Sequence, residues 1–158
     1  MVSITKGQVI SGEFGKILVR QKSDQKLELG ELLISESGEN KILLQVFDLI
    51  YGSQISQQNL ELISGLRLEE NTDTEFFDKN LRNYMLAGLK NLVTIKDNNA
   101  FVSKLMPSFF SEVREITKED LSFLTKPQNP LFIGNLRSGS KMLDVPIYLE
   151  GNNVLSHH

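Results

Sequence analysis

The sequence predicts a mainly β protein of the α+β class, built as a small closed β-barrel with a helical insertion in the middle of the chain. Three observations lead to this fold class. Short apolar runs bounded by Gly, Ser, Asp and Asn recur through the first part of the chain, at intervals of about 10 to 15 residues. A helical pattern follows in the middle. Strand patterns then return toward the end of the chain.

The first barrel segment is predicted to span residues 1–53. Its apolar runs are short and end in turn-forming residues, which is typical of strands rather than helices. The four expected strands cover residues 3–10, 15–21, 29–35 and 41–51.

The predicted insertion covers residues 54–91 and holds helices near 57–64 and 73–90. Ser56 is placed to cap the first helix and Gly65 to end it. Thr72 and Glu75 match the capping box T-x-x-E at the start of the second helix. Apolar side chains at steps of three and four residues then form one stripe of that helix: Phe77, Leu81, Tyr84, Met85 and Leu89.

The barrel is predicted to resume over residues 92–158. Asp97-Asn98-Asn99 indicates a turn between two strands, and Pro107 restricts the second strand to an edge or ends it. A short helix capped by Thr117 follows. Residues 131–137 and 142–149 are expected as two closing strands, with Pro146 tolerated only at an edge or a bulge.

Composition limits the classes of function. The chain has 158 residues, the length of one domain, with 40% hydrophobic and 23% charged residues, which are ordinary globular values. The net charge of −3 does not indicate a polycation that binds nucleic acid. No cysteine is present, which excludes disulfides and thiolate metal sites. The two histidines are terminal, which excludes catalysis by an internal histidine.

The stretch from Gly134 to Lys141 almost matches a phosphate-binding loop, G-x-x-x-x-G-K-[ST]. Ser140 precedes Lys141, so the lysine comes one residue late and no hydroxyl residue follows it. The next residues have a strand pattern instead of the helix that would offer its N-terminus to a phosphate. A Gly/Ser hairpin turn is the favoured interpretation.

Residues 12–16 also fail to match a phosphate loop, and two interpretations of this segment remain open. The favoured one is a turn joining the first two strands, with Phe14 tucked over the barrel end. The other is a contact loop at the barrel rim. The candidate contact surface comprises Phe14, Lys16, Arg20, Lys22, Arg137 and Lys141.

A nucleic-acid-binding barrel is the alternative function. Lys16, Arg20, Lys22 and Lys26 form a modest basic concentration, but single-strand binders interleave such charges with aromatic platforms. Only Phe14 is near in sequence, so solvated charges on a strand face are the favoured interpretation. The acidic residues are explained by solvation and capping near helix starts. We therefore predict no catalytic, cofactor-binding or metal-binding residue and no enzymatic activity in this chain.

The ends of the chain resemble a known family. The runs "ITKGQVISG", "GKILVR" and "LGELLI" are similar to the opening barrel of HerA-like archaeal ATPases. The closing stretch "LFIGNLRSGSKMLDVPIYLEGNNVLSHH" resembles the passage from that barrel into the motor. In the family, an "IG" strand and a short V-P-I/V strand precede a histidine, and here these are Ile133-Gly134, Val145-Pro146-Ile147 and His157 or His158. The middle of the chain, residues 54–124, departs from a plain barrel.

The resemblance implies the N-terminal HAS-barrel domain of a hexameric DNA translocase that acts in DNA end processing and recombination. It implies a non-catalytic platform that ends before the Walker A motif, with ATP and magnesium bound only by the motor domain. It also implies homo-oligomerisation, a nuclease partner of the NurA type and only indirect contact with DNA. Separately, no apolar run approaches the roughly 20 residues that span a bilayer, and the start of the chain has no signal-peptide pattern, so we expect no membrane segment and a cytoplasmic location. Alternatively, His157-His158 are remnants of an affinity tag.

Overall fold

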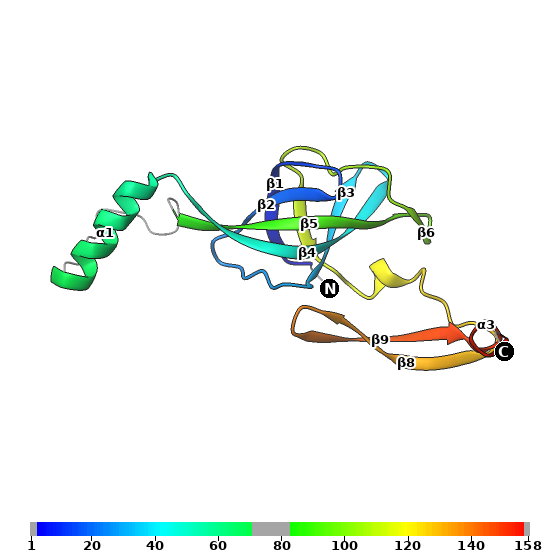
Figure 1. Cartoon of the computed structure of the whole chain (residues 1–158). Helices are drawn as coiled ribbons and strands as arrows, with labels where there is room; N and C mark the ends of the chain where they lie inside the picture. Colours follow the sequence, from blue (N-terminus) through cyan, green and yellow to red (C-terminus); the bar gives the residue numbers. More distant parts are fainter. Residues whose placement is uncertain (1–2, 71–82, 157–158) are drawn as a thin grey trace.

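The computed structural model describes residues 3–70 and 83–156 and contains a closed barrel of six antiparallel strands (Figure 1). The strands follow one another around the barrel in the order β2-β1-β7-β3-β4-β5, and pairing of β2 with β5 closes the ring. The predicted small β-barrel is therefore confirmed. Its strands are β1 (Thr5–Glu13), β2 (Lys16–Gln21), β3 (Leu32–Ser37), β4 (Asn40–Ser53), β5 (Asn83–Lys96) and β7 (Glu112–Glu115). A further short strand, β6 (Asn99–Val102), pairs with the end of β5.

Aliphatic side chains fill the interior of the barrel. Each of the six strands contributes at least one buried residue to a single apolar cluster, because alternate side chains of a barrel strand point inward. Ile17, Leu33, Leu44, Leu89 and Val113 are each 0% exposed. The interior is thus a packed core, as expected for a barrel of this size.

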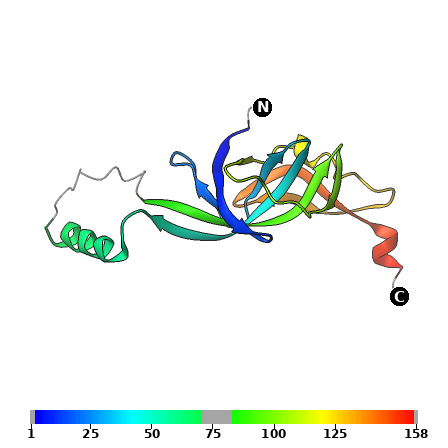
Figure 2. The same ribbon diagram turned by 90° about the horizontal axis from the view of Figure 1, so that it is seen from above.

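Strands β4 and β5 continue beyond the barrel as a two-stranded arm (Figures 1 and 2). Their register runs from Lys41 opposite Ile95 to Ser53 opposite Asn83. The arm leads to helix α1 (Gln57–Glu70), which confirms the helix predicted near residues 57–64. The helix does not end at Gly65 but continues to Glu70, since a glycine in helical conformation weakens a helix without ending it.

The prediction of a helix near residues 73–90 is wrong for residues 83–90, which belong to strand β5; residues 73–82 lie outside the described part of the chain. The apolar residues of this segment fit both a helical stripe and an alternating strand. Strands β2 and β4 decide between them, because they supply hydrogen-bond partners on both sides of β5 and bury Ala87 and Leu89 in the core. The barrel therefore resumes at Asn83 rather than at residue 92.

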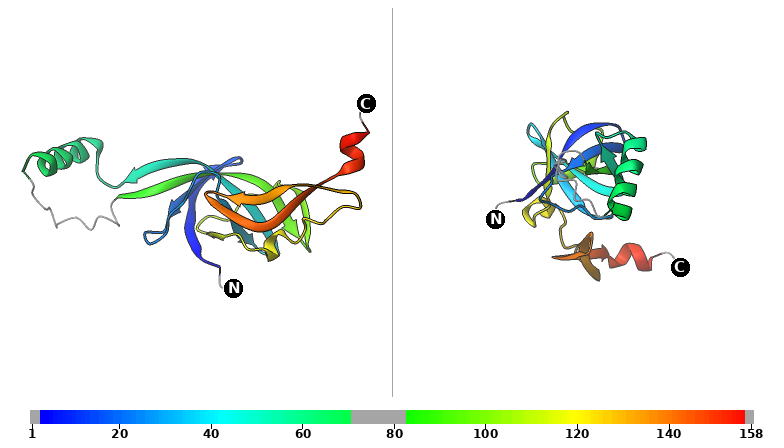
Figure 3. Two further views of the ribbon diagram at one scale, coloured as in Figure 1. Left: turned by 90° about the horizontal axis from the view of Figure 1, so that it is seen from below. Right: turned by 90° about the vertical axis from the view of Figure 1, so that its left-hand side faces the viewer.

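The two strands expected to close the barrel form a separate sheet instead. β8 (Pro130–Ser138) and β9 (Lys141–Glu150) pair with each other, outside the barrel (Figure 3). Leu136, Leu143 and Val145 of this hairpin pack on a second apolar cluster, which includes Leu32 and Ile34 of β3. The prediction failed because β7, a strand of four residues, occupies the place between β1 and β3.

Several smaller predictions are confirmed. Asp97 and Asn98 have φ values of 46° and 62°, the conformation of a type I′ hairpin turn. Pro146 lies opposite Asn135 in a two-stranded sheet, next to an irregularity of register. The short helix expected near Thr117 is present as the 3-10 helix η1 (Glu119–Leu121), but its cap was predicted wrongly: Lys118 precedes the helix without a side-chain capping bond, and the Thr117 hydroxyl donates to the Asp120 side chain. A five-residue helix, α3 (Gly151–Leu155), follows β9. None of the helices in the described residues is both long and apolar enough to cross a lipid bilayer.

Candidate functional site

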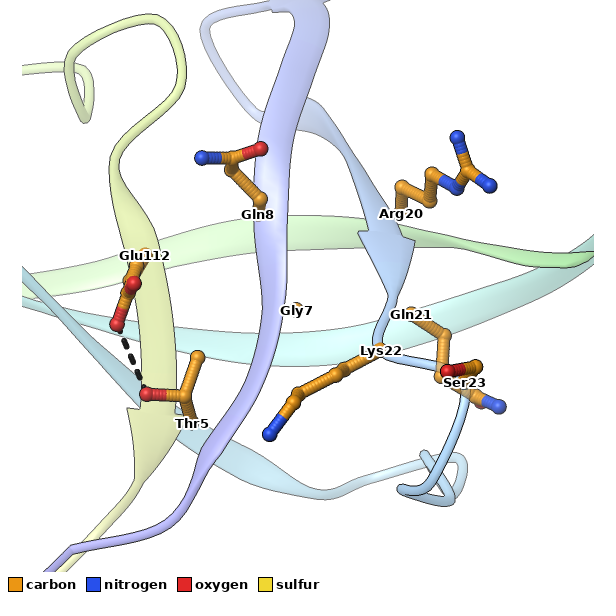
Figure 4. Close-up of a pocket in the computed structure, with 8 residues that line it drawn as sticks. All are labelled: Thr5, Gly7, Gln8, Arg20, Gln21, Lys22, Ser23 and Glu112. Atoms are coloured by element: carbon orange, nitrogen blue, oxygen red, sulfur yellow. Dashed lines mark hydrogen bonds between the residues drawn. The ribbon is translucent and has the colours of Figure 1, made fainter. Parts of the chain in front are cut away.

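A polar hollow of about 430 Å³ lies on strands β1, β2 and β7 and contains two of the predicted contact residues (Figure 4). A second hollow of about 400 Å³ shares Gln21 and Ser23 with it and reaches the arm at Tyr51 and Tyr84. The first hollow is lined by Thr5, Gly7, Gln8, Arg20, Gln21, Lys22, Ser23 and Glu112.

The polar groups of the first hollow bond mainly to other parts of the protein. The Thr5 hydroxyl donates a hydrogen bond of 2.8 Å to Glu112, and the Gln8 side-chain amide donates one of 2.8 Å to the backbone oxygen of Phe110. Lys22 pairs with Asp24 at 3.5 Å. The Arg20 guanidinium points away from Glu112 in Figure 4 and lies 4.1 Å from the ring centroid of Tyr84.

The most highly connected ionic cluster surrounds Asp120. Its carboxylate, 1% exposed, accepts hydrogen bonds from Arg114 at 2.7 and 2.9 Å and from Lys41 at 2.8 Å. The backbone N–H and the hydroxyl of Thr117 each donate a further bond of 2.9 Å. Asp120 therefore joins η1 to strands β4 and β7.

The Asp120 cluster is structural in character. Burial alone would raise the pKa of the Asp120 carboxyl, but the bonds from Arg114, Lys41 and Thr117 outweigh burial and hold that pKa below its ordinary value of 3.8. The carboxylate is thus ionised and has no surface open to a substrate. Within residues 3–70 and 83–156, no three acidic or histidine side chains gather where they could hold a metal ion.

The near-match to a phosphate loop is a hairpin turn between β8 and β9, as predicted. Gly139 has φ of 58°, and the backbone N–H of Ser140 donates a 2.7 Å hydrogen bond to the Glu28 carboxylate. The bonds from Ser140 lower the pKa of Glu28. A carboxylate of the same chain therefore takes the position at which an anion would meet this turn.

The six predicted contact residues do not form one surface. Phe14 and Lys16 lie at the β1–β2 turn, where Phe14 is exposed instead of tucked over the barrel end. Arg20 lies at the other end of β2 and Lys22 just beyond it, roughly 13 and 20 Å along the chain from Lys16. Arg137 and Lys141 belong to the separate hairpin, and Lys141 pairs with Glu115 at 3.2 Å.

Sequence reasoning missed two groups of residues. Asp120 and Arg114 were not singled out, although a Thr and an Asp three positions apart are a local signal for a side chain that bonds back to the chain. The adjacent Phe109 and Phe110 were also missed. They break the alternation of a strand and are 62% and 61% exposed. In the fold they lie next to β1, to which Phe110 is hydrogen-bonded.

No protein-family model matches the chain. No curated protein is significantly similar to it.

Proposed function

We propose that this chain is a non-catalytic assembly and partner-docking module, of the kind found as the N-terminal HAS barrel of HerA-like DNA-translocating ATPases. One observation carries the proposal: the barrel interior is filled with aliphatic side chains, whereas large apolar side chains are exposed on the parts that project from it. A closed barrel has few free strand edges, so it can present loops and hairpins on a rigid support.

The β8–β9 hairpin illustrates this distribution. Phe132 and Ile133 are adjacent on β8 and are 58% and 56% exposed. Ile133 lies at an irregularity of register between Phe132 and Gly134, so the hairpin presents two adjacent apolar side chains to solvent where the strand pairing is interrupted. A two-stranded sheet gains little stability alone, and contiguous exposed apolar surface commonly marks an interaction site. These features support docking to another molecule, including other copies of the chain.

The proposal extends to partners and cofactors. The full-length protein would form a hexameric ring in the cytoplasm, bind a nuclease of the NurA type and contact DNA only indirectly during end processing and recombination. ATP and magnesium would be bound by the motor domain of that protein. The Gly139 turn supports nucleotide binding by another domain, because the backbone N–H of Ser140, which could otherwise donate to a phosphate, donates its hydrogen bond to the Glu28 carboxylate.

Three measurements on the full chain test the proposal. Incubation with magnesium and ATP should give no phosphate release above buffer. Isothermal titration with a NurA-type nuclease from the same organism should show binding. Fluorescence anisotropy with labelled single- and double-stranded DNA, at about 50 and 200 mM salt, should show no binding at either concentration.

The possible results separate the proposal from its alternative. ATP turnover, or failure to bind the nuclease, would contradict the docking function. Binding of DNA that weakens steeply with salt would instead support a nucleic-acid-binding barrel, because counterion release makes such binding salt-dependent.

A further inference from the structure

The loop between β6 and β7 passes over one end of the barrel (Figure 1). Ser103 and Pro107 of this loop are buried, and Asn91 of β5 donates a 2.8 Å hydrogen bond to the backbone oxygen of Leu105. The β1–β2 turn lies at the same end of the barrel. We define the cap as this loop, residues 103–111, together with the turn. Its large exposed apolar side chains are Phe14 (56%), Leu105 (44%), Met106 (42%), Phe109 (62%) and Phe110 (61%).

The backbone of the loop is tied to β1 at Phe110. Phe110 has φ of 63°, a left-handed conformation that is rare for a bulky side chain. Its backbone N–H donates a 2.9 Å hydrogen bond to Val9 of β1, and Val9 in turn donates one of 2.9 Å to Ser111. Backbone strain of this kind persists only where the surrounding structure enforces it, and it is concentrated at functional sites.

The exposed apolar area of the cap suits a protein interface. Each phenylalanine offers roughly 100–150 Å² at this exposure, and Leu105 and Met106 add roughly 70 Å² each. The total, roughly 450–600 Å², lies at the upper end for the largest apolar patch of a monomer. With the usual share of polar rim, the face would reach about 800 Å², which is what each partner buries in a stable complex.

The charges of the cap indicate which partner fits. Glu13 and Lys16 flank Phe14 and are cross-strand neighbours, yet neither forms an ion pair with a described residue. Several other lysines of the described residues pair with carboxylates, for example Lys6 with Glu31 at 3.1 Å. Lys104 of the loop, like Lys16, is exposed and forms no ion pair with a described residue. The cap therefore carries unpaired charges of both signs beside its apolar centre, and such a surface can be complementary to itself. A two-fold axis can place Glu13 of one copy opposite Lys16 of the other.

We propose that the cap is an interface between two copies of this chain, which pack cap to cap about a two-fold axis. Phe109 and Phe110 are its apolar anchors, and two reciprocal Glu13–Lys16 pairs fix the orientation. The proposal goes beyond the docking function above, which requires no contact between caps.

The aromatic geometry favours a protein partner over single-stranded nucleic acid. The rings of Phe109 and Phe110 lie edge to face, with centroids 4.4 Å apart and planes at 76°. Successive bases stack on separate ring faces, whereas these two rings form a single compact knob. Such a knob suits insertion into an apolar surface.

Sedimentation equilibrium of the full chain, from about 1 to 200 µM, tests the proposal. We expect a monomer–dimer equilibrium with Kd in the micromolar range. Phe109→Ser combined with Phe110→Ser should raise Kd at least about 30-fold. Phe110→Gly, which removes the ring and suits the left-handed backbone, should also weaken the dimer while keeping the fold. Tyr51→Ser, which removes an exposed ring from the arm, is the control and should leave Kd unchanged.

Charge reversal tests the two-fold arrangement. Glu13→Lys and Lys16→Glu should each raise Kd about tenfold, because each places like charges opposite each other twice per dimer. The double reversal should restore the original Kd.

A chain that stays monomeric, a dimer insensitive to Phe110→Gly, or a double reversal that fails to restore Kd would overturn the proposal. Phe110-dependent binding of a labelled (dT)20 by a monomeric chain would overturn it in favour of a nucleic-acid surface. The proposed docking function is tested by a separate measurement, the titration with the nuclease, so failure of the dimer proposal and failure of the docking function can be told apart.

Discussion

Replacement of Asp120 by asparagine is the most direct test of how the barrel holds the segment that follows β7. Asp120→Asn keeps the size of the side chain but removes its charge. The carboxylate is 1% exposed and accepts five hydrogen bonds, three of them from Arg114 and Lys41. The substitution therefore leaves two cations facing a neutral amide.

The expected loss of stability depends on which other partners Arg114 and Lys41 have once the Asp120 charge is removed. Removal of one partner of a buried ion pair costs about 3–5 kcal/mol. Arg114 keeps its 3.0 Å contact with Glu36, and Lys41 is 40% exposed and can turn to water. We expect a loss at the lower end, about 3 kcal/mol, which corresponds to a melting temperature about 6–12 °C lower for a chain of this size.

The assay is urea unfolding at several pH values, followed by circular dichroism. The folded-state pKa of Asp120 lies below its unfolded value, so its stabilisation is present above about pH 4 and is lost as the pH falls toward the folded pKa. The difference between wild type and Asp120→Asn should thus be constant from about pH 7 to 5 and shrink below about pH 4.

Glu36→Gln provides the control. Glu36 also pairs with Arg114 but is 61% exposed, so its loss should cost less than about 1 kcal/mol. A cost below about 1 kcal/mol for Asp120→Asn, or a difference that does not narrow in acid, would refute the structural role assigned to this cluster.

Three further substitutions test the barrel and helix α1, each by thermal unfolding. Leu44→Ala removes a side chain that is 0% exposed in the core and should cost about 2–5 kcal/mol, and a smaller loss would contradict the packed interior. Gly7→Ala should cost about 1–3 kcal/mol, because a Cβ there would lie 2.8 Å from the Val19 side chain and would also press on the backbone of β2. Gly65→Ala lies within α1 with nothing within 4 Å of the added methyl, so it should leave stability unchanged or raise it by up to about 1 kcal/mol. A clear loss for Gly65→Ala would contradict the helix at this position.

Local patterns were sufficient where a segment forms its structure with its neighbours in sequence. The alternating runs in residues 1–53 became β1 to β4, and β3 pairs with β4 through a short turn. Asp97-Asn98 and Gly139 adopt positive φ values that their residue types tolerate. The first helix was found for the same reason, although its end was misplaced.

Patterns failed where distant strands decide the outcome. Strand β7 contains a single apolar residue, Val113, so its four residues carry almost no strand signal. Residues 83–90 have an apolar pattern that fits a helix, but in the fold β2 and β4 supply hydrogen-bond partners on either side of them, so they form a strand. The structural role of Asp120 depends on Lys41, a residue far away in sequence that donates a hydrogen bond to the Asp120 carboxylate in the fold.

The sequence by itself determined a β-rich chain with one helical excursion, no thiol chemistry and no complete phosphate loop, because composition and short-range periodicity are local properties. Only the tertiary structure decided how the ring closes, that β8 and β9 lie outside it, and that the β1–β2 turn lies at the same end of the barrel as the loop between β6 and β7. These features depend on pairing between segments far apart in the chain. Such pairing is fixed by the joint packing of all strands around one core, which no single stretch of residues encodes.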